Sequence, residues 1–209
     1  MAEGLTPLNL VRNGYDVIAD EYLSSRGESP ECADLLQEFM SRLPQGARIL
    51  DAACDSGVPI TRRLSQSFDV TGVDLSPEQF KGARELVPQA TFHCQDMTAL
   101  TFPNHSYDGI CSYYAIIHVP REQHPELLRT FHKLLKPGGI ALLCIGTGDL
   151  TGDVNEDWLG APMYWSHYGV ETNRRMIQGC GFTVVSSELI TDNHTEPPAR
   201  HVFVLAEKR

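Results

Sequence analysis

Three aspartates stand where strand-like segments end, a position from which side chains can bind a ligand. Asp51 follows the apolar pair Ile49–Leu50, Asp74 ends VTGVD, and Asp96 precedes Met97 after TFHCQ. In parallel sheets ligands bind at the carboxyl ends of the strands, where a carboxylate can accept hydrogen bonds from ribose hydroxyl groups. Asp96 could accept from an adenine amino group while Met97 lies on the ring. Each acid alone is more typical of a helix cap or turn, but their order along the chain favours a nucleoside site.

The turn between the first strand and the next helix is the usual place for a nucleotide-like cofactor, but its composition is unusual. Such turns are normally rich in glycine, whereas Ala53 and Asp55 stand where glycines are expected and only Gly57 remains. Asp55 tolerates a positive φ better than most residues do. Its side chain nevertheless fills space and adds a negative charge. The turn therefore predicts a cofactor site whose affinity depends on where the Asp55 side chain lies.

Side chains that could assist proton transfer follow the fourth strand-like segment. His118, in YYAIIHVP, is expected at the rim of the site, where it can act as a general base or position an acceptor. The alternative is a histidine that only binds nearby backbone or caps a helix. Tyr113 and Tyr114 follow Ser112, and side chains alternate along a strand, so we expect only one of the two tyrosines to face the site.

A second aromatic group lies in PMYWSHYGV, at the end of a segment (149–168) that we expect to be irregular. It contains Tyr164, Trp165, His167 and Tyr168. Such side chains can wall an apolar acceptor or make a cation–π contact. The alternative is a hydrophobic plug beneath a loop.

The order of elements predicts the fold class. Residues 1–45 are expected to be helical, with Tyr15, Ile18 and Tyr22 at helical spacing and a second helix capped by Ser29 and started by Pro30. Strands and helices then alternate, which is typical of a doubly wound parallel sheet. The last two strand-like runs, FTVVSSELI and HVFVLAEK, have no helix between them, so we expect them to pair antiparallel.

Composition and charge exclude several classes of protein. The 209 residues are 42% hydrophobic, which suffices for one domain with a sizeable core. The net charge is −10 and no Lys/Arg cluster is present, so nucleic acid is not expected as a partner. No apolar run approaches ~18 residues and no signal peptide is evident, so we expect no membrane span and a cytoplasmic protein. The six cysteines are widely spaced, which predicts free thiols, and no metal-ligand spacing is present.

Taken together, these segments resemble the class I S-adenosylmethionine-dependent methyltransferases of the small-molecule type. The resemblance runs from YDVIADEY to the C-terminal GF and HVFVLAEK, through ILDAACDSGVPITRRL, VTGVDLSPEQF, HCQDMTAL, YDGICSYYAIIHVP and LLKPGGIALL. It implies an α/β, Rossmann-like, doubly wound and mostly parallel seven-stranded sheet with an antiparallel C-terminal strand. It also implies one domain over 1–209, made of an N-terminal helical lid (1–45), a cofactor-binding core (46–148) and an acceptor-side insertion with C-terminal strands (149–209).

The resemblance implies S-adenosylmethionine as the cofactor and a small molecule with an O, N or S acceptor atom as the partner. Arg26 would pair with the methionine carboxylate, which Asp55 would repel, although Asp55 could attract the ammonium or sulfonium. The catalytic candidates are His118, Tyr113 and His167. The cofactor-binding candidates are Tyr15, Tyr22, Arg26, Asp51, Ala53, Cys54, Asp55, Gly57, Asp74, Leu75, Asp96, Met97 and Ser112.

Three functions fit these features. The first is methyl transfer with a tolerated or compensated turn, which the intact set of acids favours. The second is a methyltransferase-like regulatory or partner protein that binds the cofactor weakly or not at all, as the charge of Asp55 would explain. The third is a non-methylating enzyme, such as an isomerase or cyclase, in the same pocket. A dinucleotide dehydrogenase is disfavoured because G-x-G-x-x-G is absent.

Overall fold

The computed structural model describes residues 6–26, 32–192 and 198–209, without the side chain of Arg26. Its main sheet has seven strands, β1 (Arg48–Ala52), β2 (Asp69–Asp74), β3 (Thr91–Cys94), β4 (Tyr107–Ser112), β5 (Leu135–Gly146), β8 (Phe182–Asp192) and β9 (Ala199–Lys208). A separate hairpin consists of β6 (Leu150–Trp158) and β7 (Ala161–His167). The helices are α1 (Pro7–Arg26), α2 (Ala33–Ser41), α3 (Ile60–Leu64), α4 (Pro77–Leu86), α5 (His124–Leu134) and α6 (Val170–Gly179), with short 3₁₀ turns η1 (Met97–Ala99), η2 (Ile116–His118) and η3 (Arg121–Gln123).

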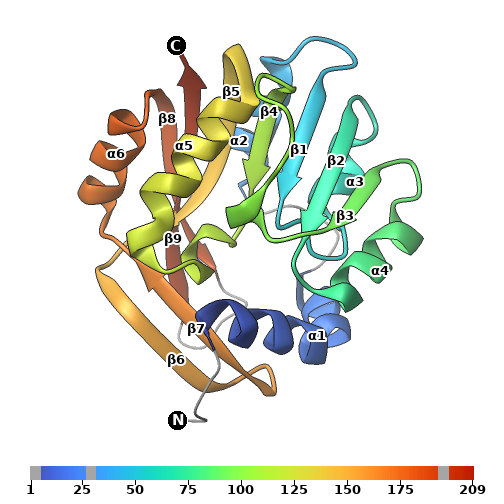
Figure 1. Ribbon diagram of the computed structural model, residues 1–209, viewed down its shortest axis with the longest axis vertical. Helices are drawn as coiled ribbons and strands as arrows, with labels where there is room; N and C mark the ends of the chain where they lie inside the picture. The colour runs from blue at the N-terminus through green and yellow to red at the C-terminus, as the bar shows by residue number, and fades with distance from the viewer. Residues whose placement is uncertain (1–5, 27–31, 193–197) are drawn as a thin grey trace.

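The strand order across the main sheet is β3-β2-β1-β4-β5-β9-β8 (Figure 1). The pairs from β3 to β5 are all parallel, and β9 is antiparallel to both β5 and β8. The predicted doubly wound sheet with an antiparallel C-terminal strand is therefore confirmed. The order reverses between β1 and β4, and in open α/β sheets this switch point is where ligands bind.

Both faces of the sheet are buried, which explains why the central strands are continuously apolar. On one face Leu50 packs in a core with Phe131 of α5 and Ile177 of α6. On the other face the neighbouring residue Ile49 packs with Phe39 of α2. Successive side chains of β1 thus pack into opposite cores. The two cores hold the strand in place and so fix the position of Asp51 and the turn that follows it.

Helix α1 and the β6–β7 hairpin form a third layer at the carboxyl ends of the strands (Figure 1). Their shared core includes Ile18 and Met163, both nearly inaccessible to solvent. Gly14 allows the close approach of the two elements, because a Cβ atom there would lie 2.8 Å from the carbonyl oxygen of Pro162. The hairpin thus holds α1 over the strand ends, whereas α2, which also falls within the lid expected from residues 1–45, packs on a face of the sheet.

Three local predictions differ from the structure. Residues 149–168, expected to be irregular, contain the hairpin, whose first strand is solvent-exposed and so lacks an apolar pattern that sequence could reveal. Helix α2 begins at Ala33 after Cys32, which has a positive φ of 56°; the expected cap Ser29 and Pro30 lie outside the described residues. The KPGG turn lies within β5, which already begins at Leu135.

Candidate active site

A cavity of about 270 Å³ lies at the carboxyl ends of β1 to β4, beneath the N-terminal half of α1. Its walls come from the lid, from the turns after β1 and β2, from the segment after β3 and from the loop between β4 and α5. The lining residues are Thr6, Pro7, Leu8, Val11, Tyr15, Ala53, Asp55, Asp74, Leu75, Gln95, Asp96, Met97, Thr98, Tyr113, Tyr114, Ala115, His118, Val119, Pro120 and Gln123.

The turn after β1 keeps a glycine-like backbone without the glycines. Ala53 has a φ of 63° and Asp55 a φ of 49°, both in the left-handed region that favours glycine. The backbone N–H of Asp55 donates to Oδ2 of Asp74 over 2.8 Å. Both Ala53 and Asp55 line the cavity, so the turn itself lies where a ligand would bind.

Asp74 is the buried carboxylate of the cavity. Its second oxygen, Oδ1, accepts the backbone N–H of Ser76 over 2.9 Å. Burial raises the pKa of Asp74 to about 6, although these backbone donors act in the opposite direction. A carboxylate oriented by backbone in this way can accept further hydrogen bonds from hydroxyl groups in the cavity.

Asp51 lies behind this site and does not line the cavity among the described residues. Its oxygens accept the hydroxyl of Thr61 over 2.5 Å and the thiol of Cys111 over 3.3 Å. Burial raises the pKa of Asp51 to about 6. Asp51 therefore ties β1 to α3 and β4 and supports the turn from below.

After β3, Asp96 both caps a helical turn and lines the cavity, the two roles considered for it from the sequence. It caps η1 by accepting the backbone N–H of Thr98 over 2.8 Å and the Thr98 hydroxyl over 2.7 Å. It also lines the cavity together with Met97. A capping role and contact with a ligand are thus compatible here.

His118 joins the loop after β4 to the lid. Its Nδ1 lies 2.7 Å from the carbonyl oxygen of Tyr164 and its Nε2 lies 3.0 Å from the hydroxyl of Tyr15. Since a carbonyl can only accept, Nδ1 carries the proton, and in neutral His118 the Tyr15 hydroxyl then donates to Nε2. His118 is 8% exposed and lines the cavity together with Tyr15, so this hydrogen-bonded pair belongs to the cavity wall.

Both tyrosines after β4 line the cavity, contrary to the expectation that only one would. Strand β4 ends at Ser112, and Tyr114 has a φ of 51°, so the alternation of a strand no longer applies. The hydroxyl of Tyr113 is buried and has no hydrogen-bond partner among the described residues. Ser112 is itself buried and does not belong to the described lining.

The aromatic residues of the hairpin form a plug behind His118 and the lid. The ring of Trp165 lies 5.5 Å from His118 and 5.4 Å from Trp158, which in turn lies 5.8 Å from Tyr22. Neither tryptophan nor Tyr22 is among the described lining residues. The plug alternative therefore describes this cluster, which holds α1 in place.

His167 is placed away from the cavity. Its Nδ1 lies 2.5 Å from the carbonyl oxygen of Gly148, and its ring packs on Gly146, where a Cβ atom would clash with it. These contacts give His167 a structural role in packing β7 against the end of β5. The structure does not bring His167 together with His118 and Tyr113.

Comparison with known proteins gives a consistent set of relatives. A model described as a methyltransferase domain matches residues 49–139. The 2-methyl-6-phytyl-1,4-hydroquinone methyltransferase of Synechocystis sp. is 32% identical over 172 residues, which are 68% of this chain and 52% of the relative. Phosphoethanolamine N-methyltransferase 1 of Arabidopsis thaliana is 32% identical over 167 residues, or 75% of this chain and 33% of the relative. The chain thus spans about half or less of these curated relatives.

A solved structure has the same fold over its full length. It is magnesium protoporphyrin IX methyltransferase from Synechocystis PCC 6803 with bound S-adenosylmethionine, which covers 100% of both chains with a TM-score of 0.77 and 15% identity. The chain belongs to the class I S-adenosylmethionine-dependent methyltransferase family. The residues quoted for the resemblance, and the mostly parallel sheet with an antiparallel C-terminal strand that it implied, both agree with this membership.

The cavity fits the cofactor of the methyltransferase family in chemistry and position. It places a hydroxyl-accepting carboxylate, Asp74, between a left-handed turn at Ala53 and Asp55 and the Asp96–Met97 pair. Leu75 also lines it, whereas Cys54 and Gly57 belong to the turn but not to the described lining. Tyr15 faces the cavity from the lid, and the side chain of Arg26 lies outside what the structure describes.

Sequence reasoning missed the apolar part of the lining. Leu8 and Val11 contribute from the lid, two helical turns and one helical turn before Tyr15 respectively, and the polar Gln123, also missed, contributes from the segment before α5. Their spacing of three and four residues could have indicated a shared helix face with Tyr15. In the part of the chain that the structure describes, no helix is long and apolar enough to cross a membrane, and no cluster of His, Cys, Asp and Glu could hold a metal ion.

Proposed function

We propose that this protein transfers a methyl group from S-adenosylmethionine to a small-molecule acceptor. The observation that carries this proposal is one cavity lined by two chemically distinct groups of residues. Asp74 and the Asp96–Met97 pair suit a nucleoside, and the Tyr15–His118 pair suits a proton-bearing acceptor. The named methyltransferases among the relatives support the same reaction.

In this proposal the cofactor is held by this chain's own groups in the following way. Asp74 accepts hydrogen bonds from the ribose hydroxyls, and Asp96 and Met97 hold the adenine. The turn at Ala53 and Asp55 lets the backbone approach the methionyl end. Asp55 faces its cationic groups, the ammonium and sulfonium. The chemistry supplied by bound S-adenosylmethionine is an activated methyl group on a sulfonium.

The chain's contribution to the chemical step is positioning and proton removal. Methyl transfer is a displacement, for which alignment of the reactants matters most. The Tyr164 carbonyl fixes the tautomer of His118 and leaves Nε2 free of a proton. Nε2 then takes the proton of the acceptor, either directly or through the hydroxyl of Tyr15. This arrangement suits an O or N acceptor that loses a proton on methylation.

We place the protein in the cytoplasm, because all six of its cysteines are free thiols. Calorimetry with S-adenosylmethionine and S-adenosylhomocysteine, followed by mass spectrometry of incubations with candidate acceptors, tests the proposed reaction. We expect binding of both compounds and formation of one S-adenosylhomocysteine per methylated product. Absence of binding by folded protein would favour the regulatory alternative. Turnover of an acceptor with the methyl group still on the cofactor would favour a non-methylating enzyme.

A further inference from the structure

Three consecutive residues of α1 attach this helix to three different parts of the molecule. At Gly14 the helix lies against β7, where a Cβ atom would be 2.8 Å from a backbone carbonyl oxygen. Tyr15 is hydrogen-bonded to His118 after β4 over 3.0 Å. Asp16 accepts the hydroxyl of Ser76, the residue before α4, over 2.5 Å. Helix α1 therefore spans the strand ends between the hairpin and α4 (Figure 1).

The contact of Asp16 reaches the cavity through Ser76. The Ser76 hydroxyl oxygen caps α4 by accepting the backbone N–H of Gln79 over 3.1 Å. Its own backbone N–H donates to Oδ1 of Asp74 over 2.9 Å. The backbone N–H of Glu78 donates to Asp16 over 3.4 Å, so the carboxylate of Asp16 lies at the N-terminus of α4, where the helix dipole favours a negative charge. One chain of hydrogen bonds thus links α1, the cap of α4 and the buried carboxylate of the cavity.

Asp16 holds the helix without forming part of the cavity wall. Neither Asp16 nor Ser76 is among the described lining residues, whereas Leu8, Val11 and Tyr15 of the same helix are. A nucleoside bound at the strand ends therefore lies beneath side chains of α1. Loss of the Asp16–Ser76 bond frees α1 from α4 but removes no group from the described lining.

We propose that the Asp16–Ser76 hydrogen bond is a latch that controls how fast the cofactor is exchanged. In this view Asp16 is a positioning residue, and α1 shifts away from α4 when S-adenosylmethionine enters and when S-adenosylhomocysteine leaves. The inference rests on the proposed function and concerns the regulation of the same site. Such movements set the rate of product release in many enzymes. Because the latch lies outside the lining, weakening it should speed entry and exit alike and change the affinity little.

Asp16→Ala tests the latch on the complex with S-adenosylhomocysteine. The dissociation rate is measured by chasing the radiolabelled compound with an excess of the unlabelled one, and the affinity by calorimetry. We expect a dissociation rate about tenfold higher and an affinity within about threefold of the parent, as for loss of one charge-assisted hydrogen bond outside the ligand contacts. Asp16→Asn keeps an oxygen that can accept the same hydroxyl without the charge, so its rate should lie between the two.

Two results would overturn the proposal. The first is a dissociation rate in Asp16→Ala that is equal to or lower than that of the parent. The second is a higher dissociation rate matched by an equal loss of affinity, since Asp16 would then stabilise the bound ligand and not control its passage.

Ser76→Ala completes a double-mutant cycle. It should raise the dissociation rate by a similar factor, and adding Asp16→Ala should raise it no further, because the same bond is already broken. Multiplied effects of the two changes would contradict a shared latch. Ser76→Ala also removes the cap of α4 and so lowers stability, which denaturant titration measures separately. If this variant does not fold, the comparison of Asp16→Ala with Asp16→Asn carries the test.

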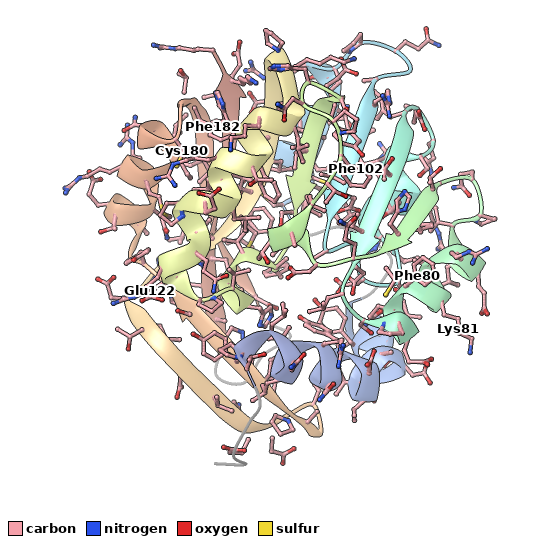
Figure 2. The ribbon with its side chains drawn as sticks, in the orientation of Figure 1. Phe80, Lys81, Phe102, Glu122, Cys180 and Phe182 are labelled. Atoms are coloured by element: carbon pink, nitrogen blue, oxygen red, sulfur yellow. The ribbon has the colours of Figure 1, made fainter. Side chains whose placement is uncertain are left out.

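Two exposed charges serve as matched controls. Asp20 lies one turn after Asp16 on α1, and Lys81 points outward from α4 (Figure 2). Asp20→Ala and Lys81→Ala each remove a charge from one of the two helices and leave the latch intact. Both should keep the dissociation rate within about twofold of the parent. An effect of Asp20→Ala as large as that of Asp16→Ala would contradict the latch.

Failure of this inference is distinguishable from failure of the proposed function. Calorimetry of the parent protein with S-adenosylhomocysteine reports the cofactor site before any variant is made. If the parent does not bind the compound, the proposed function is wrong and the latch fails with it. If the parent binds and Asp16→Ala exchanges the compound no faster, only the latch is wrong.

Discussion

The hydroxyl of Tyr15 lies 3.0 Å from Nε2 of His118, although 103 residues separate the two in sequence. The bond joins the lid helix α1 to the loop after β4, directly across the cavity. On its far side His118 is fixed by the carbonyl of Tyr164 in β7. One imidazole thus connects the lid helix, the hairpin and the loop that follows β4.

The first prediction concerns the proposed base. His118→Ala should lower kcat by about 10²- to 10⁴-fold, because a positioned general base contributes that much. Tyr15→Phe should lower it less, since Nε2 remains, and the double variant should be no worse than His118→Ala. Steady-state kinetics, with the affinity for S-adenosylhomocysteine measured separately, check this.

Val17→Ala is the matched control for the lid. Val17 lies on α1, is 71% exposed and is not among the described lining residues. The change should keep kcat within about twofold, since it shortens an exposed side chain outside the cavity. Full activity of His118→Ala would rule out His118 as the base, and strictly additive losses in the double variant would show that Tyr15 does not act through His118.

The second prediction is a pH dependence of cofactor binding. Burial raises the folded-state pKa of Asp74 to about 6, above the unfolded value, so this group stabilises the fold below its unfolded pKa and loses that contribution as pH rises through 6. Ribose hydroxyls bind the ionised form, and a proton therefore competes with the ligand. The affinity for S-adenosylhomocysteine should be constant above pH 7 and fall about tenfold per pH unit below 6.

Calorimetry between pH 5 and pH 8 provides the measurement. Asp74→Asn should bind weakly at every pH and show no such slope, whereas the exposed acid Asp69, changed to Asn, should retain it. An unchanged slope in Asp74→Asn would assign the titration to another group, such as Asp51.

Much of this site could be predicted from the sequence because its residues occupy fixed places relative to strands. Asp74 and Asp96 follow apolar runs whose ends meet at one edge of the sheet, and the topology follows from the alternation of elements. The replacement of glycines by Ala53 and Asp55 predicted a conflict between the backbone conformation that the turn requires and the side chains present in it. The structure resolves the backbone part of that conflict, since both residues adopt the positive φ that glycine would have supplied.

What could not be predicted depends on contacts between distant segments. The partner of His118 comes from α1 and its tautomer from β7, and no local pattern encodes either contact. From the sequence, the aromatic residues of the hairpin fitted an acceptor wall as well as a hydrophobic plug. Their packing against α1 depends on the tertiary structure and leaves no local pattern in the sequence. Tyr113 and Tyr114 both line the cavity because the strand ends one residue before them, and strand ends are poorly defined by sequence.

The third prediction concerns stability at the opposite end of the sheet. Lys208 in β9 is 6% exposed, and its ammonium donates to the carbonyl oxygens of His132 over 2.6 Å and Leu135 over 2.8 Å. It thereby satisfies carbonyl groups at the end of α5. Lys208→Met should cost about 2–4 kcal/mol of unfolding free energy, as measured by denaturant titration.

The exposed Lys133 on the same helix is the matched control. Lys133→Met should change the unfolding free energy by no more than ~0.5 kcal/mol. Neither variant should alter cofactor affinity, because both lie away from the cavity. A Lys208→Met protein as stable as the parent would show that water replaces the lost donors.

The fourth prediction addresses Asp55, whose backbone and side chain act separately. Its N–H supports Asp74, and its φ of 49° is one that Asn and Gly also adopt readily. Asp55→Asn therefore removes the charge and keeps the turn. S-adenosylmethionine carries a sulfonium that S-adenosylhomocysteine lacks, so a carboxylate in the cavity favours the former. We expect Asp55→Asn to lower the ratio of the two affinities about three- to tenfold in favour of S-adenosylhomocysteine.

Two further variants separate the charge of Asp55 from its conformation. Asp55→Gly should match Asp55→Asn, because both remove the charge without strain, whereas Asp55→Ala should in addition lose about 1–2 kcal/mol of stability. Glu78→Gln, an exposed acid in the first turn of α4, should leave the ratio of affinities unchanged. If the parent fails to bind either compound and Asp55→Gly binds both, the carboxylate occupies the place of the methionyl group. The chain would then be the regulatory relative rather than the enzyme.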